Sequence, residues 1–132
     1  MIAKNGMATV ALLGAFALSG CAGTKTYQDA GVYKGENYLL DVTWEDGAVF
    51  RTTYVSVNGD KILTIDREAL RGTAENCQHT SFYVRRCVFN TEYEGRDVEV
   101  VTTSDVQVGQ QNTYYSISFD GTLIRRMTVP FM

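Results

Sequence analysis

His79 is the only histidine in the sequence, so it is the only side chain that could act as the base of a nucleophilic triad. Ser81 and Asp105 provide the other two residue types that such a triad requires. No serine lies in a sequence of the nucleophile-elbow type. His79 also follows Cys77 in a polar stretch, where a histidine is ordinarily in contact with water. We therefore expect His79 to be a solvated loop residue and expect no triad.

Two pairs of acidic residues are close enough in the sequence to suggest acid–base catalysis. They are Glu45 with Asp46, and Glu92 with Glu94. Both pairs flank expected turns, where acidic residues are common, and successive strand residues point to opposite faces of a sheet. We therefore expect no catalytic residues, and the chain is not predicted to be an enzyme.

Two arginine doublets, at residues 85–86 and 125–126, lie inside expected strands. By alternation, Arg86 and Arg125 each share a strand face with apolar side chains. These are Phe82, Val84 and Val88 for the first strand, and Leu123, Met127 and Val129 for the second. A buried charge without a partner is costly, so each arginine needs a carboxylate or an anionic ligand. One hypothesis is an anion-recognising cavity lined by both arginines.

The alternative is that these arginines have no role in ligand recognition. Their strand ends could face solvent, or the guanidinium groups could form structural salt bridges. The carboxylates that we consider for such salt bridges are Asp41, Asp66 and Glu99.

The first twenty residues have the three parts of an export signal. Residues 1–5 form a short n-region with Lys4 as the only charged side chain, and residues 6–18 form an uncharged apolar stretch. This stretch is shorter than the roughly 17–25 residues that a membrane span needs. It ends in Leu18, Ser19, Gly20 and Cys21.

These four residues resemble the lipobox of bacterial lipoproteins, in which a branched apolar residue, a small residue and Gly or Ala precede a cysteine. The resemblance implies that residues 1–20 are a cleaved signal peptide, that Cys21 carries a diacylglycerol on sulfur, and that its new amino group is acylated with a chain such as palmitate. Several acyl chains together anchor a protein stably to a membrane. Ala22 stands where enterobacterial lipoproteins of the inner membrane have aspartate. The resemblance therefore favours the outer membrane and a periplasm-facing domain, with the inner membrane or the cell surface as alternatives.

The chain has three cysteines, and with lipid on Cys21 the other two are an even pair in an oxidising compartment. We therefore predict a disulfide between Cys77 and Cys87, with Cα atoms about 4.4–6.8 Å apart. Closing this ring of eleven residues would contribute about 2.8 kcal/mol. The bond would fold the connection at residues 67–80 back along the next strand and present His79 as a contact surface. Because only His79 could join the cysteines as a ligand, we predict no metal site and no cofactor.

Apolar and polar residues alternate with a period of two from residue 37 onwards, as in half-buried β-strands. Turn signals separate the strands at residues 46–47, 58–59, 94–96 and 120–121. We predict an all-β domain: an antiparallel meander of about seven strands that closes as a barrel or a curved sandwich, and we favour the barrel or a strongly curved sheet. One short helical turn is expected at residues 67–71. The sequence shows no evident internal repeat.

The chain thus divides into a signal peptide at residues 1–20, a lipidated cysteine with a polar tether at residues 21–36, and a β-domain at residues 37–132. The formal charge is −3, and the basic residues are interspersed with acidic ones. The sequence therefore lacks the basic patch that nucleic-acid binding requires.

We expect a non-enzymatic outer-membrane lipoprotein that contacts the membrane through its lipid anchor. Its small size and its lack of a catalytic constellation favour a binding or accessory subunit of a cell-envelope assembly, with a protein of the envelope as partner. The alternative is a lipid-anchored carrier or inhibitor whose arginine-lined cavity takes a small anion or a peptide.

Overall fold

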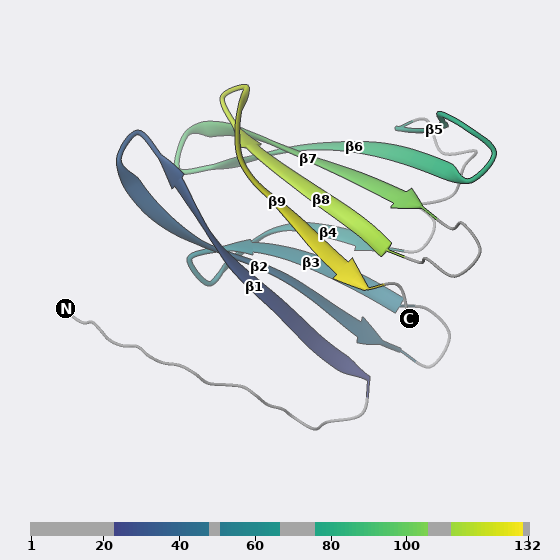
Figure 1. Cartoon of the computed structure of the whole chain (residues 1–132). Helices are drawn as coiled ribbons and strands as arrows, with labels where there is room; N and C mark the ends of the chain where they lie inside the picture. Colours follow the sequence, from purple (N-terminus) through teal and green to yellow (C-terminus); the bar gives the residue numbers. More distant parts are fainter. Residues whose placement is uncertain (1–22, 48–50, 67–75, 106–111, 131–132) are drawn as a thin grey trace.

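The computed structural model describes residues 23–47, 51–66, 76–105 and 112–130, and in these residues it contains nine strands in two antiparallel sheets. The first sheet consists of β1 (Thr24–Tyr33), β2 (Glu36–Asp46), β3 (Arg51–Val57) and β4 (Asp60–Asp66). The second consists of β5 (Cys77–His79), β6 (Val84–Tyr93), β7 (Arg96–Asp105), β8 (Asn112–Phe119) and β9 (Thr122–Pro130). Within each sheet, every strand pairs with its neighbours in the sequence, and the two sheets face each other as separate layers (Figure 1).

The fold is therefore the predicted all-β antiparallel meander, and the sandwich is the closure that forms. The barrel that we favoured is wrong, because the strand ladders of the described residues stop at β4 and restart at β5. β4 and β5 lie along one margin of the sandwich, and β1 lies beside β9 along the opposite margin. Side-chain contacts and backbone packing join β1 to β9, and no strand ladder connects them. We call the margin of β1 and β9 the seam.

Two of the nine strands were not expected from the sequence. β5 is a three-residue strand in the connection that we predicted to be irregular. β1 occupies most of the segment that we predicted to be a tether, so this prediction is wrong over Thr24–Tyr33. All ten residues of β1 pair with β2, and Tyr33 at its end is buried. The helical turn expected at residues 67–71 lies outside the described residues.

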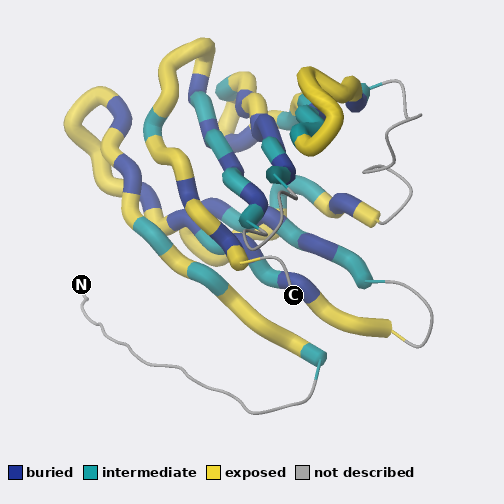
Figure 2. Tube along the Cα trace, turned by 45° about the vertical axis from the view of Figure 1, so that its right-hand side comes forward, coloured by how far each residue is buried: buried dark blue, intermediate teal, exposed yellow. Residues whose placement is uncertain are grey.

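The core fills the space between the inner faces of the two sheets. Buried and exposed residues alternate along the strands, as Figure 2 shows. The side chains with essentially no exposure include Leu40, Val42, Val55 and Val57 from the first sheet, and Val98, Val100, Ile117 and Phe119 from the second. Each such burial contributes roughly 1.5–3 kcal/mol relative to an exposed side chain.

The two ends of the sandwich differ in how the strands are connected. At one end lie four two-residue hairpin turns, each with a left-handed residue followed by a left-handed glycine: Lys34-Gly35, Asn58-Gly59, Glu94-Gly95 and Asp120-Gly121. We call this the turn end; it lies on the left of Figure 1. At the opposite loop end, β1 begins, β9 ends, and the longer connections between strands start.

The two sheets repeat the same plan of two hairpins, although the sequence showed no repeat. Asn58, at the second turn of the first sheet, exchanges hydrogen bonds with the backbone of Leu39: its Oδ1 accepts from Leu39 N–H at 2.9 Å, and its own N–H donates to Leu39 O at 2.8 Å. Asp120 has the equivalent position in the second sheet and makes the same two bonds with Asp97, at 3.0 and 2.8 Å.

Reciprocal contacts between the sheets follow the same plan. Tyr33 ends β1, and its hydroxyl donates to Asp120 Oδ2 at the opposite sheet's second turn (3.3 Å). Tyr93 ends β6, and its hydroxyl donates to Asp60 Oδ2 beside the other second turn (3.4 Å). The sandwich is thus built from two similar four-stranded units, β1–β4 and β6–β9, that pack face to face.

Candidate functional site

The structure joins Cys77 and Cys87 by a disulfide between β5 and β6, in agreement with the prediction. Their Cα atoms are 4.0 Å apart, closer than we expected, because the two residues are directly opposite each other in an antiparallel pair. The bond folds residues 77–79 back along β6. Cys21, the predicted lipidation site, lies outside the described residues.

His79 is exposed at the end of β5, in a strand and not in a loop. It lies opposite Arg85 in the ladder with β6, whereas Asp105 lies opposite Val84 on the other side of that strand. Among the described residues, His79 therefore has no serine and aspartate arranged around it as a triad would require.

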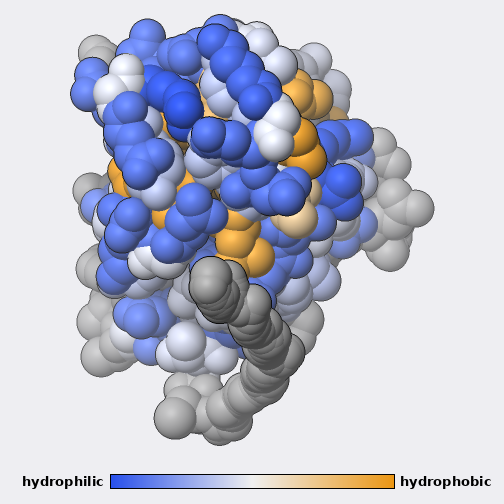
Figure 3. Space-filling model, turned by 90° about the vertical axis from the view of Figure 1, so that its left-hand side faces the viewer, coloured by the Kyte–Doolittle hydropathy of each residue, from blue (hydrophilic) through white to orange (hydrophobic). Residues whose placement is uncertain are grey.

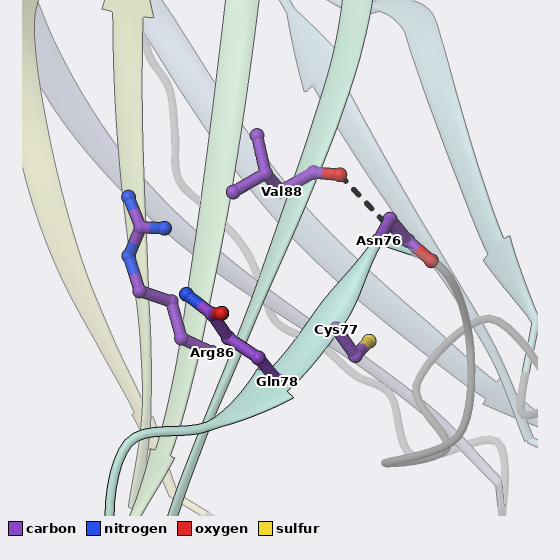
Figure 4. Close-up of a pocket in the computed structure, with 5 residues that line it drawn as sticks. All are labelled: Asn76, Cys77, Gln78, Arg86 and Val88. Atoms are coloured by element: carbon purple, nitrogen blue, oxygen red, sulfur yellow. Dashed lines mark hydrogen bonds between the residues drawn. The ribbon is translucent and has the colours of Figure 1, made fainter.

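Arg86 does not point into the core, so the predicted phase of this strand is wrong. Cys87 and Phe89 face the core, and the row containing Arg86 and Val88 faces outward. Arg86 lines a pocket of about 250 Å³ on the outer side of β5 and β6, together with Asn76, Cys77, Gln78 and Val88 (Figure 4). No carboxylate of the described residues forms a salt bridge with Arg86.

Arg125 has a carboxylate partner, but not one of the three that we considered. Its Nε donates to Asp29 Oδ2 at 2.7 Å, across the seam from β9 to β1. The two side chains are 49% and 33% exposed. Arg125 and Arg86 lie on β9 and β6, with two strands between them, and Arg125 does not line the Arg86 pocket. The hypothesis of a cavity lined by both arginines is therefore wrong.

Arg85 is the arginine of the first doublet that has the inward position, and the sequence interpretation missed it. Its Nε is buried without a hydrogen-bond partner among the described residues. The same is true of Oγ1 of Thr102, which lies on β7 two residues before Ser104, the residue opposite Arg85. Next to Arg85, Ser104 and Thr113 are buried, and their hydroxyls lie 3.4 Å apart. The core thus becomes polar towards the loop end, while it is apolar in the middle of the sandwich.

Tyr115 belongs to the same polar part of the core. Burial raises the pKa of its phenol to about 12, opposed by a hydrogen bond with Thr53 and by the charge of Arg51. Arg51 in turn lies 3.9 Å from the ring centroid of Trp44 and forms a salt bridge with Asp46 at 2.7 Å. These contacts hold the loop end together and present no exposed nucleophile or base.

At the turn end, Tyr38 links two charged residues of opposite sheets. Its hydroxyl donates to Glu36 Oε1 at 2.9 Å and accepts a hydrogen bond from Arg96 Nη1. Burial is the main cause that raises the pKa of Tyr38. The guanidinium of Arg96 also lies 5.5 and 5.6 Å from the ring centroids of Tyr33 and Tyr38. All of these polar groups have partners, so the cluster fixes the turn end and shows no catalytic arrangement.

The exposed large apolar side chains form two groups at opposite ends of the sandwich. Near the turn end, Val32 and Leu39 are diagonal neighbours on the outer face of β1 and β2. Leu123 lies across the seam beside Val32, because Gly31 packs against Ile124. We call Val32, Leu39 and Leu123 the seam patch; they are 59%, 43% and 58% exposed. Figure 3 views the turn end and shows orange apolar areas among blue hydrophilic surface.

The second group, at the loop end, consists of Phe82 and Tyr83, which we call the aromatic tip. They are 88% and 46% exposed, and their rings contact each other edge to face with centroids 5.0 Å apart. They occupy the turn between β5 and β6.

Within the described residues, no group of three or more His, Cys, Asp or Glu side chains is arranged to hold a metal ion. The described part of the chain also contains no helix with the length and apolarity of a membrane span. Comparison of the chain with protein-family models, curated proteins and solved structures found no match.

Proposed function

We propose that this protein is an outer-membrane lipoprotein, anchored through acyl chains on Cys21, whose β-sandwich is a non-enzymatic binding or accessory subunit of a cell-envelope assembly. The observation that carries the proposal is the sequence Leu18 to Cys21 after an apolar stretch, immediately before a folded domain. Only Ala22 and Gly23 separate Cys21 from the first residue of β1.

This short spacing supports a fixed orientation of the domain on the membrane. An extended chain spans at most about 3.6 Å per residue, so the three steps from Cys21 to Thr24 reach about 11 Å. With lipid on Cys21, the loop end would therefore face the bilayer. The strands of ten or so residues are roughly 33 Å long, so the turn end would lie that much further out.

The seam patch supports a partner-binding role for the outer part of the domain. Single exposed apolar residues are normal, but three neighbouring ones across a strand seam are a candidate protein contact. Charged side chains border them, among them Lys34 at the first turn and the Arg125–Asp29 pair. An apolar centre with a polar rim is the usual composition of a transient protein interface.

The anchor is tested by metabolic labelling with a radioactive fatty acid. We expect labelled protein in the outer-membrane fraction, and no label in the Cys21→Ser variant. A label that persists in this variant would contradict lipidation at Cys21, and mass spectrometry of the mature amino terminus would locate the attached chains.

The binding role is tested by photo-crosslinking in living cells. A crosslinking residue at Leu123 should give one adduct of defined mass. The matched control is Thr128, which is also exposed on β9 but lies closer to the loop end. Equal adducts at both positions, or none at any seam-patch position, would count against a partner at the turn end.

The second candidate function is a lipid-anchored carrier or inhibitor that binds a small anion. The Arg86 pocket supports it, because its arginine has no carboxylate partner among the described residues. Inorganic phosphate and small dicarboxylates should then raise the thermal unfolding temperature of the protein but not that of Arg86→Gln. Equal shifts in both proteins would remove this candidate.

A further inference from the structure

We propose that the aromatic tip, Phe82 and Tyr83, is a second membrane contact that inserts into the headgroup region of the same bilayer that holds the acyl chains. The inference rests on the proposed lipidation of Cys21. It adds a surface of the folded domain that binds lipid, and it fixes which side of the domain faces the membrane.

The first argument is the exposure of the tip. Phe82 is 88% exposed, the highest value among the large hydrophobic residues of the described chain, and Tyr83 is 46% exposed. The transfer of an exposed phenylalanine side chain from water to an apolar phase has a favourable free energy. Tyrosine has an apolar ring with a polar end, and such side chains collect at the boundary between headgroups and acyl chains.

The second argument is that the tip is held in place before it meets any partner. The N–H of Thr80 donates to Val84 O at 3.0 Å, and Val84 N–H donates back to Ser81 O at 3.4 Å. Ser81 Oγ also accepts from the N–H of Tyr83 at 3.4 Å. The disulfide joins the two strands that carry the tip, and Val88 N–H donates to Asn76 O at 2.9 Å on its far side. Because the tip is already ordered, insertion costs little conformational entropy.

The third argument is location. Val84 lies opposite Asp105, at the end of β7 that faces away from the Glu94-Gly95 turn, so the tip projects beyond the sheet at the loop end. β1 begins at this same end, three residues after Cys21. Figure 1 shows the start of β1 and the β5–β6 turn on the same side of the molecule, at opposite margins. An acyl anchor at one margin and an aromatic contact at the other would support the domain at two points.

The fourth argument is charge. Residues 79–86 contain exposed His79 and outward-facing Arg86 and no acidic residue, whereas Arg85 points inward and Asp105 of β7 lies opposite Val84. Arg86 is on the outer face and lacks a carboxylate partner among the described residues, so it is free to approach a phosphate of a lipid headgroup. Basic residues beside an exposed apolar group are typical of proteins that bind the surface of anionic membranes. This combination favours a lipid surface over a protein partner at the aromatic tip.

The test uses tryptophan as a depth probe in the full lipidated protein. Phe82→Trp is compared with Leu123→Trp, which replaces a 58% exposed apolar residue in the turn-end half of β9 and is the matched control. Both proteins are reconstituted into vesicles of phosphatidylethanolamine and phosphatidylglycerol that contain lipids brominated on the acyl chain. The unsubstituted protein gives the background of Trp44. Equal thermal unfolding temperatures and non-reduced masses confirm that both variants fold and keep the disulfide.

We expect bromine quenching of Phe82→Trp several-fold above that of Leu123→Trp, with emission shifted to shorter wavelength for Phe82→Trp alone. Quenching that is equal in the two variants, or absent from Phe82→Trp, would overturn the inference; a tip reserved for a protein partner gives the latter result. Mass spectrometry and flotation of the same samples distinguish a failure of the proposed lipid anchor from a failure of the proposed membrane contact at the tip. Unlipidated protein that fails to float refutes the proposed function, and the inference with it. Lipidated, floating protein with an unquenched tip refutes only the inference.

Discussion

An ion pair between Arg125 on β9 and Asp29 on β1 bridges the seam of the sandwich. Both side chains are partly exposed, and pairs of this kind contribute about 0.2–1 kcal/mol. We predict that a double-mutant cycle of Asp29→Asn and Arg125→Gln gives a coupling energy in that range by urea unfolding. A coupling near zero would show that packing alone joins β1 to β9.

The buried phenol of Tyr115 makes the stability of the domain depend on pH in the alkaline range. In the unfolded chain this phenol loses its proton near pH 10, whereas in the folded protein it does so at about 12. Between these values the unfolded state binds fewer protons, so the free energy of unfolding falls as the pH rises. Full stability from this group is present below pH 10.

We predict that the unsubstituted protein loses about 2 kcal/mol more than Tyr115→Phe between pH 10 and 12. Tyr115→Phe lacks the hydrogen bond with Thr53 at every pH, so the difference in slope isolates the titration. Denaturant unfolding at a series of pH values measures it. Parallel stability curves for the two proteins would mean that the phenol is accessible to solvent.

For single residues, the sequence predicted which side chains pair better than it predicted which face of a strand a side chain occupies. The Cys77–Cys87 bond followed from the number of cysteines, once the resemblance assigned Cys21 to lipid. The direction of Arg86 did not follow, because Val84 and Val88 on one face and Phe89 on the other make β6 apolar on both sides. Alternation cannot then tell which face meets the core, and only the ladder with β7 decides it.

Among the elements, three of the four hairpin turns were expected from the sequence, whereas the turn at Lys34-Gly35 lay inside the predicted tether. Asn58-Gly59 and Asp120-Gly121 are the residue types that tolerate left-handed conformations, and both form the expected turns. Lys34 and Glu94 adopt the same conformation with φ of 49° and 51°, although their side chains favour it less.

This difference gives a prediction for Glu94, which is exposed and left-handed. Replacing it with asparagine should stabilise the domain by about 0.5–1 kcal/mol, because asparagine adopts positive φ at lower cost. Asn58→Ala is the opposite change and should destabilise, since it also removes the bond to Leu39 N–H. Thermal unfolding of both variants checks the two signs. A destabilised Glu94→Asn would show that contacts of the carboxylate outweigh the backbone cost.

The hairpin of β5 and β6 depends on the disulfide, because β5 has only three residues and pairs with no other strand of the described chain. We predict that Cys77→Ser combined with Cys87→Ser lowers the free energy of unfolding by about 2–3 kcal/mol. Amide hydrogens of β5 should also exchange much faster, while those of β7 and β8 stay protected. Unchanged exchange in β5 would show that the ladder alone holds it.

β1 shows why one whole strand was interpreted as a tether. Its outward row begins with the polar residues Thr24, Thr26 and Gln28. Its inward row contains Asp29 and Gly31 where a core strand would have large apolar residues. Gly31 is required by close packing: an added Cβ would lie 3.2 Å from Leu40 Cδ1 and 3.3 Å from the carbonyl oxygen of Ile124. Composition alone therefore resembled a linker, and only the pairing with β2 reveals the strand.

For the molecule as a whole, the sandwich consists of two similar four-stranded units, and the sequence did not reveal this repeat. The residues that make the units equivalent are few: a tyrosine before the first turn and Asn or Asp at the second. Tyr33 and Tyr93 reach across the sandwich in opposite directions, so each unit is completed by the other. β1 is an integral part of the first unit, and the domain cannot be shortened at its amino end without exposing the edge of β2.

Replacing residues 24–33 with a Gly/Ser segment of equal length therefore tests the whole architecture. It removes the ladder with β2, the burial of Tyr33 and the Asp29–Arg125 pair. We expect a loss of more than about 5 kcal/mol, which is the entire stability of many domains, so the protein should not fold. Near-ultraviolet circular dichroism and urea unfolding measure this. The control inserts eight Gly/Ser residues between Ala22 and Gly23 and should leave the unfolding curve unchanged. A replaced chain that keeps a native spectrum would mean that these residues are a tether after all.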